Sequence, residues 1–352
     1  MPNDTSAHTQ RLAQGRFELL PLCLVVVLIG LMLASLTLGR YPLSLREVVH
    51  AVFSSMPFGA TGDYSDKPWV VTEIIRMPRI LLVTICGMGL ALSGATMQGV
   101  FRNPLVGPEI AGVTAGASLG GVAAMMLGWS TAATVGMAFG SGLLALFAAF
   151  SLAMVAGRAS TLALVLSGVI VGGFCSSITG LLLTMADPNM RLPSLMFWLL
   201  GSFVSATYDK VLVVSAVTLV AGTLILLLRW RINLLSLGDA DARALGLNVE
   251  ILRWVLMALV AVIVSAQVSV SGGVGWVGLI VPHLARLMVG PDHSRLLPTS
   301  AILGGIYLLI MDDIARSVGA QEIPIGFLTS VVGTPIFAFL FWRLQARSWT
   351  DA

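Results

Sequence analysis

Long apolar runs without a single charge alternate along the chain with short polar segments. Residues 19–38, 80–101, 211–228 and 323–342 form four such runs. Each is close to the length that one helix needs to cross a bilayer, about 20 residues. The pattern therefore predicts four membrane-spanning helices from these runs alone.

Two longer apolar stretches have to be divided. Residues 110–157 carry no charge and are too many for one helix, and the segment Gly128-Trp129-Ser130-Thr131 supplies a turn between two. Residues 254–282 are interrupted at Ser271-Gly272-Gly273, so we expect one helix before the glycines and a second that continues to near Gly290.

Residues 159–186 and 296–311 complete the series of apolar runs and bring the expected count to ten. Residues 192–208 are also uncharged and would make an eleventh span. Arg191 and Pro193 at the start of this run, and Gly201-Ser202 within it, favour an interfacial helix instead. We therefore expect ten spans, with eleven possible.

The composition excludes a water-soluble enzyme. Apolar residues make up 57% of the 352 residues, charged residues 11%, and the mean hydropathy is +0.94, whereas soluble domains have about 45–50% apolar and about 25% charged residues. In a membrane protein, a small positive net charge such as this +3 reflects Lys and Arg in the loops on the cytoplasmic side. Nucleic acid is therefore not expected as a partner. The sequence predicts an all-α polytopic membrane protein.

The distribution of Lys and Arg indicates which way the helices face. With ten spans and the N-terminus inside, the inner segments hold 12 of the 20 basic residues and the outer segments hold 8, which nearby acids almost match. Both termini are thus expected in the cytoplasm. The expected organisation is a tail at 1–18, one transmembrane domain at 19–344 and a tail at 345–352. A periplasmic loop is expected at about 39–79 and a cytoplasmic loop at about 229–250.

No enzyme or metal motif is present. HExxH, GxSxG and GxxxxGK[ST] are all absent, so no ATPase site of its own is expected. Cys23, Cys86 and Cys175 lie in apolar runs without a CxxC pair, and we interpret them as small buried apolar residues, with no metal or cofactor expected. Ion-driven carriers need ionisable groups in their spans. Here only Asp312 and Asp313 come near, and a solvated ion pair with Arg316 is the expectation.

Two turns carry polar groups that suit recognition. Arg76-Met77-Pro78-Arg79 places two arginines at the outer mouth of the second span, where they would pair with carboxylates of an external partner. Snorkelling towards lipid headgroups is the alternative. The segment Arg102-Asn103-Pro104-Leu105 begins a rigid turn at the inner end of the same span, for which a plain connection is the alternative.

The inner loop at 229–250 predicts two short helices. Gly238 would end the first, Asp239 would cap the second and Gly246 would end it. Leu235, Leu237 and Leu245 are then expected on the cytoplasmic surface, where a partner protein would cover them.

These segments, taken in order, resemble the FecCD/BtuC family, the permease subunits of type II ABC importers for ferric siderophores, haem and corrinoids. The matching motifs run from residue 76 almost to the end: Arg76-Met77-Pro78-Arg79, Ser93-Gly94 with Gln98, Arg102-Asn103-Pro104-Leu105, Trp198-Leu199-Leu200-Gly201-Ser202, Leu237-Gly238-Asp239 with Ala242 and Leu245-Gly246, Gly278 to His283 with Arg286, Ile323-Pro324-Ile325-Gly326, and Gly333-Thr334-Pro335. The first 75 residues match in outline only. Gly107 and Glu109 stand where relatives vary, and Trp276 stands where Phe is usual.

The resemblance implies a dimer of permeases, identical or different, around a central path, with both termini cytoplasmic in the inner membrane. It implies two copies of a cytoplasmic ATP-binding subunit and a periplasmic substrate-binding protein as partners. The residues assigned by resemblance are, for ATPase docking, Leu237, Gly238, Asp239, Ala242, Leu245 and Gly246; for binding-protein docking, Arg76, Arg79 and Arg316; and for the inner mouth of the path, Asn103, Pro104, Leu105 and Thr161.

The expected cargo is a bulky iron chelate, most of all a ferric siderophore. Haem, a corrinoid or molybdate fits the same uncharged walls and stays an alternative cargo. An ion-driven secondary carrier is a less favoured alternative for the class of transporter. A scaffold subunit without transport is the further competing hypothesis.

Overall fold

The computed structural model describes residues 4–54, 67–155, 161–319 and 321–350, and every regular element in these ranges is helical. The elements are α1 (Asp4–Thr37), α2 (Leu45–Ser54), α3 (Lys67–Trp69), η1 (Val70–Arg76), α4 (Met77–Phe101), η2 (Pro108–Ala111), α5 (Val113–Met126), α6 (Thr131–Val155), α7 (Thr161–Thr184), α8 (Leu192–Leu199), α9 (Tyr208–Leu227), α10 (Arg229–Ser236), α11 (Asp239–Ala244), α12 (Val249–Ser271), α13 (Val277–Val289), α14 (His293–Ser317) and α15 (Ile325–Thr350). The prediction of an all-α membrane protein is confirmed.

Seven helices in the described part of the chain are long and apolar enough to cross a membrane, and three shorter apolar helices accompany them. The shorter ones are Val113–Met126, Val277–Val289 and Ile325–Phe339. These ten segments correspond one to one with the ten expected spans. Helix α8 has only 8 residues, about 12 Å of helix, and cannot cross a bilayer.

The helix breaks lie where the glycines predict them. The segment between α5 and α6 contains Gly128 at φ +71°, and Gly272 at φ +70° follows the last residue of α12. Positive φ values favour glycine because it has no Cβ. Helix α14 is longer than the expected run of residues 296–311, and it includes the charged residues Asp312, Asp313 and Arg316.

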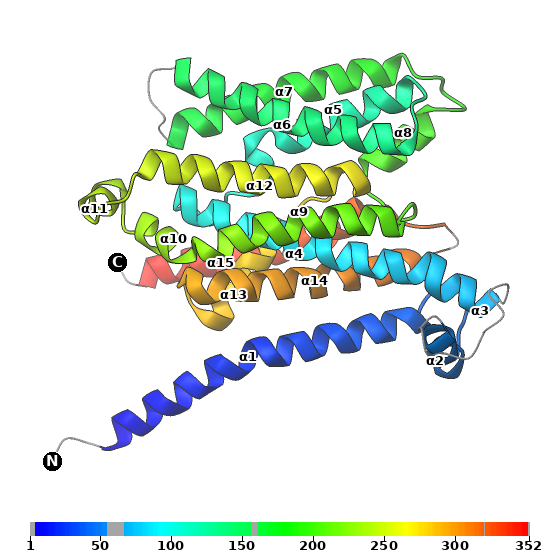
Figure 1. Ribbon diagram of the computed structural model, residues 1–352. Coiled ribbons are helices and arrows are strands. Elements are labelled where there is room, and N and C mark those ends of the chain that lie inside the picture. Colours follow the sequence, from blue (N-terminus) through cyan, green and yellow to red (C-terminus); the bar gives the residue numbers. More distant parts are fainter. Residues whose placement is uncertain (1–3, 55–66, 156–160, 320, 351–352) are drawn as a thin grey trace.

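The long helices run roughly side by side, so the bundle has two ends (Figure 1). One end holds α10 and α11, the first turn of α1 and the last turn of α15, and we call it the α11 end. The opposite end holds α2, α3 and α8, and we call it the α2 end. Helices α5, α6 and α7 form a layer on one side of α12, and α4, α13 and α14 lie on the other.

Helix α4 is the most deeply buried spanning helix, and its glycines allow the close packing that this requires. A Cβ on Gly87 would collide with the backbone of Gly304 in α14, and a Cβ on Gly94 would collide with the backbone of Gly278 in α13. Lipid provides no hydrophobic force between helices, so close backbone approach and van der Waals contact hold them together. Gly136 and Gly140 of α6, by contrast, have open space beside them.

Some predicted boundaries and environments differ from the structure. Helix α1 begins at Asp4 and α15 continues to Thr350, so both expected tails are helical extensions of the first and last spans within the described residues. Cys86 and Cys175 are buried as expected, but Cys23 is exposed on α1, because this helix packs against the bundle along one side only. Part of the expected outer loop, residues 55–66, lies outside the described residues.

Candidate functional site

Two short helices project from the bundle at the α11 end. Gly238, at φ +123°, separates α10 from α11, and Gly246, at φ +85°, follows α11. Leu237 and Leu245 have 58% and 59% of their surface exposed. A pair of exposed leucines on a compact projecting element is the kind of surface that a partner protein covers.

Leu235 corrects one prediction for this element, because it is buried rather than exposed. Only 1% of its surface is accessible, and it belongs to the same core cluster as Ile232 of α10 and Ala242 of α11. Helix α10 packs against α4 and α14, so its inward face is covered by them. The surface available to a partner is therefore narrower than the sequence predicted.

Asp239 does not cap α11 as predicted, but ties the projecting element to two spanning helices. It is the first residue of α11, and the cap position belongs to Gly238. Its carboxylate pairs with Arg102 at 3.2 Å and with Arg253 of α12 at 3.1 Å. Arg253 is almost fully buried, so the shared carboxylate neutralises a charge that would otherwise stand alone.

Arg102 and Asn103 form the turn that follows α4. Arg102 ends α4 in the left-handed conformation at φ +51°, and the Asn103 side-chain oxygen accepts a hydrogen bond from the Leu105 backbone N–H at 2.9 Å. Such a side-chain turn fixes the backbone before Pro104. Asn103 and Leu105 are exposed. Thr161 is the first residue of α7, and its side chain lies outside the described residues.

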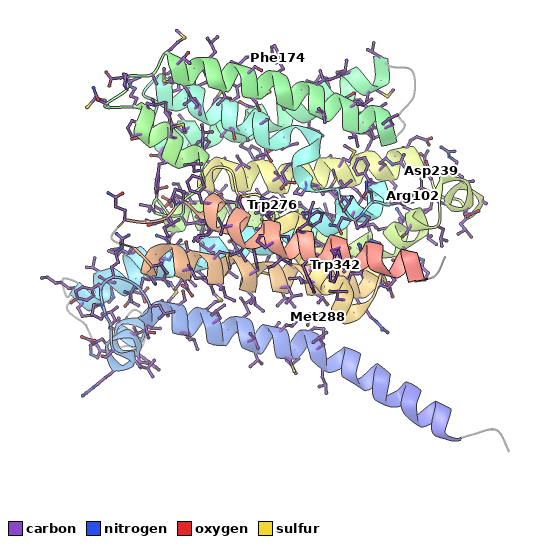
Figure 2. The ribbon with its side chains drawn as sticks, turned by 180° about the vertical axis from the view of Figure 1, so that it is seen from behind. Arg102, Phe174, Asp239, Trp276, Met288 and Trp342 are labelled. Carbon is purple, nitrogen blue, oxygen red and sulfur yellow. The ribbon has the colours of Figure 1, made fainter. Side chains whose placement is uncertain are left out.

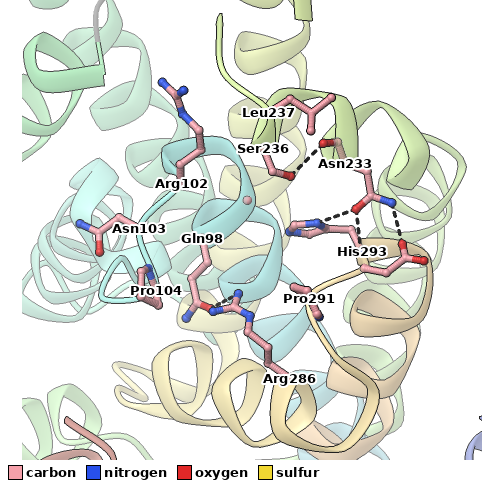
Figure 3. Close-up of a pocket in the computed structure, with 12 residues that line it drawn as sticks. Gln98, Arg102, Asn103, Pro104, Asn233, Ser236, Leu237, Arg286, Pro291 and His293 are labelled. Carbon is pink, nitrogen blue, oxygen red and sulfur yellow. Dashed lines mark hydrogen bonds between the residues drawn. The ribbon is translucent and has the colours of Figure 1, made fainter. Parts of the chain in front are cut away.

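A pocket of about 580 Å³ brings the Asn103-Pro104 turn and the projecting helices together. Figure 3 shows Arg102, Asn103 and Pro104 on one side of it and Ser236 and Leu237 on the other. The remaining lining residues are Gln98, Gly99, Asn233, Arg286, Pro291, Asp292 and His293. Two elements that the sequence pointed to separately thus share one site.

Asn233 organises the far wall of this pocket, which sequence reasoning missed. Its side-chain oxygen accepts from the His293 backbone N–H at 2.8 Å and lies 2.9 Å from Nδ1 of the same histidine, while Nδ2 donates to Asp292 at 2.6 Å (Figure 3). Burial raises the pKa of Asp292, but hydrogen bonds from Ser294 and Asn233 outweigh it and lower this pKa overall. An aspartate that precedes a helical run is the sequence signal that would have indicated this cap.

Arg286 points into the same pocket from α13. It donates a hydrogen bond to the Gln98 side-chain oxygen at 3.2 Å. Together with Arg102, it gives the pocket two guanidinium groups, and Asp239 pairs with one of them. The pocket can therefore accept a polar or acidic side chain.

A cluster of charges lies at the α2 end of the bundle. Arg79 makes a two-point ion pair with Asp312, with 2.7 Å between Nη2 and Oδ1 and 2.9 Å between Nε and Oδ2. The same guanidinium reaches Glu322, with 2.7 Å between Nη2 and Oε1. All the described contacts of this guanidinium are carboxylates of this chain.

Arg76 and Arg316, the other two arginines assigned to binding-protein docking, are also buried. Arg316 pairs with Asp313 at 2.5 Å and donates to the Ser35 backbone oxygen at 2.6 Å, and Arg76 donates to the Leu36 backbone oxygen at 2.6 Å. These bonds hold the end of α1 against the end of η1 and against α14. The expectation of a solvated pair between Arg316 and the two aspartates is therefore wrong, because the ions are enclosed between three helices.

Comparison with known proteins identifies the chain. The model of the FecCD transport family matches residues 26–343. The chain belongs to the FecCD transport family. The molybdate import system permease protein MolB of Haemophilus influenzae is 40% identical over 326 residues, which cover 92% of this chain and 95% of MolB. The cobalamin import system permease protein BtuC of Halobacterium salinarum is 35% identical, with the same two coverages. The hemin transport system permease protein HmuU of Yersinia pestis is also 35% identical.

Solved structures agree with this family assignment. One described as an inward-facing conformation of a metal-chelate type ABC transporter is 38% identical, covers 92% of this chain and superposes with a TM-score of 0.81. A second, PsaBC from Streptococcus pneumoniae in complex with Fab, is 19% identical with a TM-score of 0.52 and supports the fold alone. The chain is a multi-pass membrane permease of the ABC importer class.

Within this FecCD-family permease, the residues assigned by resemblance form two separate groups. Of those at the α11 end, Asn103, Pro104 and Leu237 line the pocket, and Asp239 is joined to it through its ion pair with Arg102. The side chain of Thr161 is not described. Figure 2 shows Arg102 and Asp239 at this end, far from the α2 end. Arg76, Arg79 and Arg316 gather at the α2 end, but they are 4–8% exposed and bonded within the chain. Docking of a binding protein there stays a prediction.

Proposed function

We propose that this chain is the membrane-spanning subunit of an ABC importer that moves a bulky iron chelate, most of all a ferric siderophore, into the cytoplasm. Two permeases, identical or different, would enclose the path. Two copies of a separate ATPase subunit would drive transport, and a periplasmic binding protein would deliver the cargo. The family assignment supports the importer class. The observation on this chain that supports the proposal most directly is the pair of projecting helices α10 and α11.

The projecting helices suit the docking of an ATPase subunit. Leu237 and Leu245 offer apolar contact, and the neighbouring pocket offers a recess for a partner side chain. Asp239 connects this surface to Arg102 at the end of α4 and to Arg253 in α12. A movement imposed on α11 would therefore reach the turn at Asn103, which we assign to the inner mouth of the path.

The proposed orientation has the α11 end in the cytoplasm of a cell whose inner membrane holds the permease. The first turn of α1 and the last turn of α15 lie at this end of the bundle (Figure 1). Most of the Lys and Arg residues lie in segments that we assign to it. The α2 end would then face the binding protein. There, carboxylates of the partner would compete with Glu322 for Arg79, since Glu322 is the more exposed of the two acids that pair with it.

The proposed cargo is based on the cargoes named for similar proteins. Relatives named as probable iron chelatin permeases of Helicobacter pylori are 39% and 38% identical over 77% and 78% of this chain. A probable siderophore permease, YfiZ of Bacillus subtilis, is 32% identical over 91%. The 40% identity to MolB makes an oxyanion such as molybdate the second candidate.

Uptake by vesicles tests the proposal. The chain is reconstituted with its ATPase subunit and binding protein, and uptake of a ferric hydroxamate, haemin, cobalamin and molybdate is measured with and without ATP. We expect ATP-dependent uptake of the ferric chelate. Uptake of molybdate alone would overturn the choice of cargo, and uptake driven by an ion gradient without the ATPase would overturn the importer.

A matched pair of variants tests the docking surface. Leu237→Asp places a charge on the proposed contact, whereas Leu45→Asp changes a leucine of α2 at the other end that is also well exposed. We expect the first to abolish ATPase binding and the second to leave it unchanged. Equal ATPase binding by both variants would remove α10 and α11 as the docking surface.

A further inference from the structure

Glu109 is a carboxylate that lies deep in the bundle although it belongs to a turn. Helix α4 ends at Phe101, but the chain then returns towards the middle of that helix. Pro108, directly before Glu109, packs against Gly278, and Gly278 in turn approaches the Leu90 backbone oxygen. Leu90 lies eleven residues before Phe101. At 1.5 Å per residue this is about 16 Å along the helix axis.

The partner of Glu109 lies at a similar depth. The backbone N–H of Trp276, the residue before α13, lies near the Glu109 carboxylate. Helix α13 has 13 residues, about 20 Å, and ends beside the pocket at the α11 end. Figure 2 shows Trp276 about midway along the bundle. Pro108 and Glu109 therefore both lie against the start of α13, which places the turn within the membrane's thickness.

The backbone around Glu109 is shaped to hold this side chain. A Cβ on residue 107 would collide with the Glu109 carboxylate, so Gly107 leaves the space that it fills. Trp276 adopts φ +70°, unusual for a residue with a side chain, and this conformation accompanies the contact. Gly107, Glu109 and Trp276 are the three positions at which the sequence departs from the motifs it resembles, and here they form one unit.

The turn that carries Glu109 has α7 and, through Trp276, α15 as neighbours. The turn packs on α7, where a Cβ on Gly112 would approach the Gly168 backbone oxygen. Trp276 contacts Phe337 of α15, with 6.2 Å between the ring centroids. The Glu109 side chain is nevertheless exposed. Ionisable groups at membrane depth face water-filled spaces or protein rather than lipid, so the exposed carboxylate marks a water-filled space between these helices.

We propose that Glu109 lines the translocation path and selects the charge of the cargo. In a dimer of two identical chains, the carboxylate would occur twice around the path. A neutral or cationic metal chelate passes these groups, whereas a dianion such as molybdate is repelled by both. The inference rests on the proposed function and narrows it, because it favours a chelate over the oxyanion that MolB is named for.

Charge-selective thiol labelling tests this without any transport. Thr334 is exposed on α15 beside Gly333, which packs on Trp276, so Thr334→Cys provides a reporter once Cys23, Cys86 and Cys175 are replaced by Ser or Ala. Cationic and anionic methanethiosulfonates are applied to the reconstituted full chain, and the ratio of their labelling rates is measured. We expect Glu109→Gln to lower the cation-to-anion ratio by roughly threefold to tenfold.

A control variant and a separate measurement of folding accompany the labelling experiment. Glu47→Gln makes the same change on exposed helix α2 and should leave the ratio unchanged. The elution profile of each variant in size-exclusion chromatography reports folding. An unchanged ratio in Glu109→Gln, or no labelling of the introduced reporter thiol in the folded protein despite labelling after denaturation, overturns the inference. Because labelling needs neither ATPase nor cargo, failed uptake in the vesicle assay would count against the proposed function and not against the role of Glu109.

Discussion

The guanidinium of Arg79 and the carboxylate of Asp312 join the α2 ends of α4 and α14 by two parallel contacts, of 2.7 Å and 2.9 Å. Asp312 is fully buried, and Arg79 is nearly so. Glu322 completes the arrangement from the segment that connects α14 to α15. One arginine thus holds two spanning helices and the start of a third in a fixed relation.

Removing the charge of Asp312 is expected to destabilise the permease strongly. Asp312→Asn keeps the size of the side chain but leaves Arg79 with Glu322 as its only carboxylate contact among the described residues. Breaking a buried pair on one side typically costs about 3–5 kcal/mol. Thermal unfolding in detergent measures the loss, and Glu322→Gln, which changes the more exposed partner, should lose much less. Equal losses in both variants would show that burial of Asp312 does not decide the strength of the pair.

The Glu322→Gln variant also tests how a binding protein reaches Arg79. The neutral amide competes less well than the carboxylate for the guanidinium, so a carboxylate of the partner should bind more readily. We expect affinity for the purified binding protein to rise roughly fivefold, equivalent to about 1 kcal/mol. Surface plasmon resonance over a salt series measures this, since charged contacts weaken as salt rises. Weaker binding in this variant would mean that Glu322 itself contacts the partner.

The sequence predicted the fold well because spanning helices are defined by composition over about 20 residues. The breaks at Gly128 and Gly272 were equally visible, since both residues adopt positive φ. The depth of the turn after α4 was not predictable. Residues 102–108 were expected to form a turn at the inner end of the span, and only the packing of Pro108 on Gly278 shows that Glu109 lies inside the bundle.

The sequence predicted those features of the candidate site that depend on neighbouring residues. It did not predict the ion pairs between residues that are far apart in the sequence. Gly238 and Gly246 divide α10 and α11 by their own backbone conformations. Arg79 and Asp312 are 233 residues apart, and no local pattern tells that they pair. For the same reason, the outer arginines were expected at the surface, whereas their partners on other helices bury them.

Helix packing at Gly94 gives a prediction with a built-in control. A Cβ on Gly94 would collide with the backbone of Gly278, so Gly94→Ala must push α4 away from α13. Overpacking of this kind costs about 1–3 kcal/mol, and we expect a lower unfolding temperature in detergent. Gly136→Ala introduces the same methyl group where nothing lies within 4 Å. It should leave the temperature unchanged or raise it slightly, because alanine favours helix. A larger loss at Gly136 than at Gly94 would contradict the packing described here.

Asp239 is expected to couple the docking surface to the path. Its carboxylate bridges Arg102 at the end of α4 and the buried Arg253 of α12, so Asp239→Asn weakens both connections. The exposed leucines on either side of α11, Leu237 and Leu245, are unchanged. We expect ATP hydrolysis to continue and uptake per ATP to fall roughly fivefold to thirtyfold, corresponding to about 1–2 kcal/mol of coupling. Asp241→Asn removes a charge two residues away on the same exposed element and serves as the control.

Parallel measurement of ATPase rate and uptake in vesicles separates coupling from docking. If Asp239→Asn lowers both rates together, the residue acts in docking, and if Asp241→Asn uncouples equally, the bridge to Arg102 and Arg253 is not the connection.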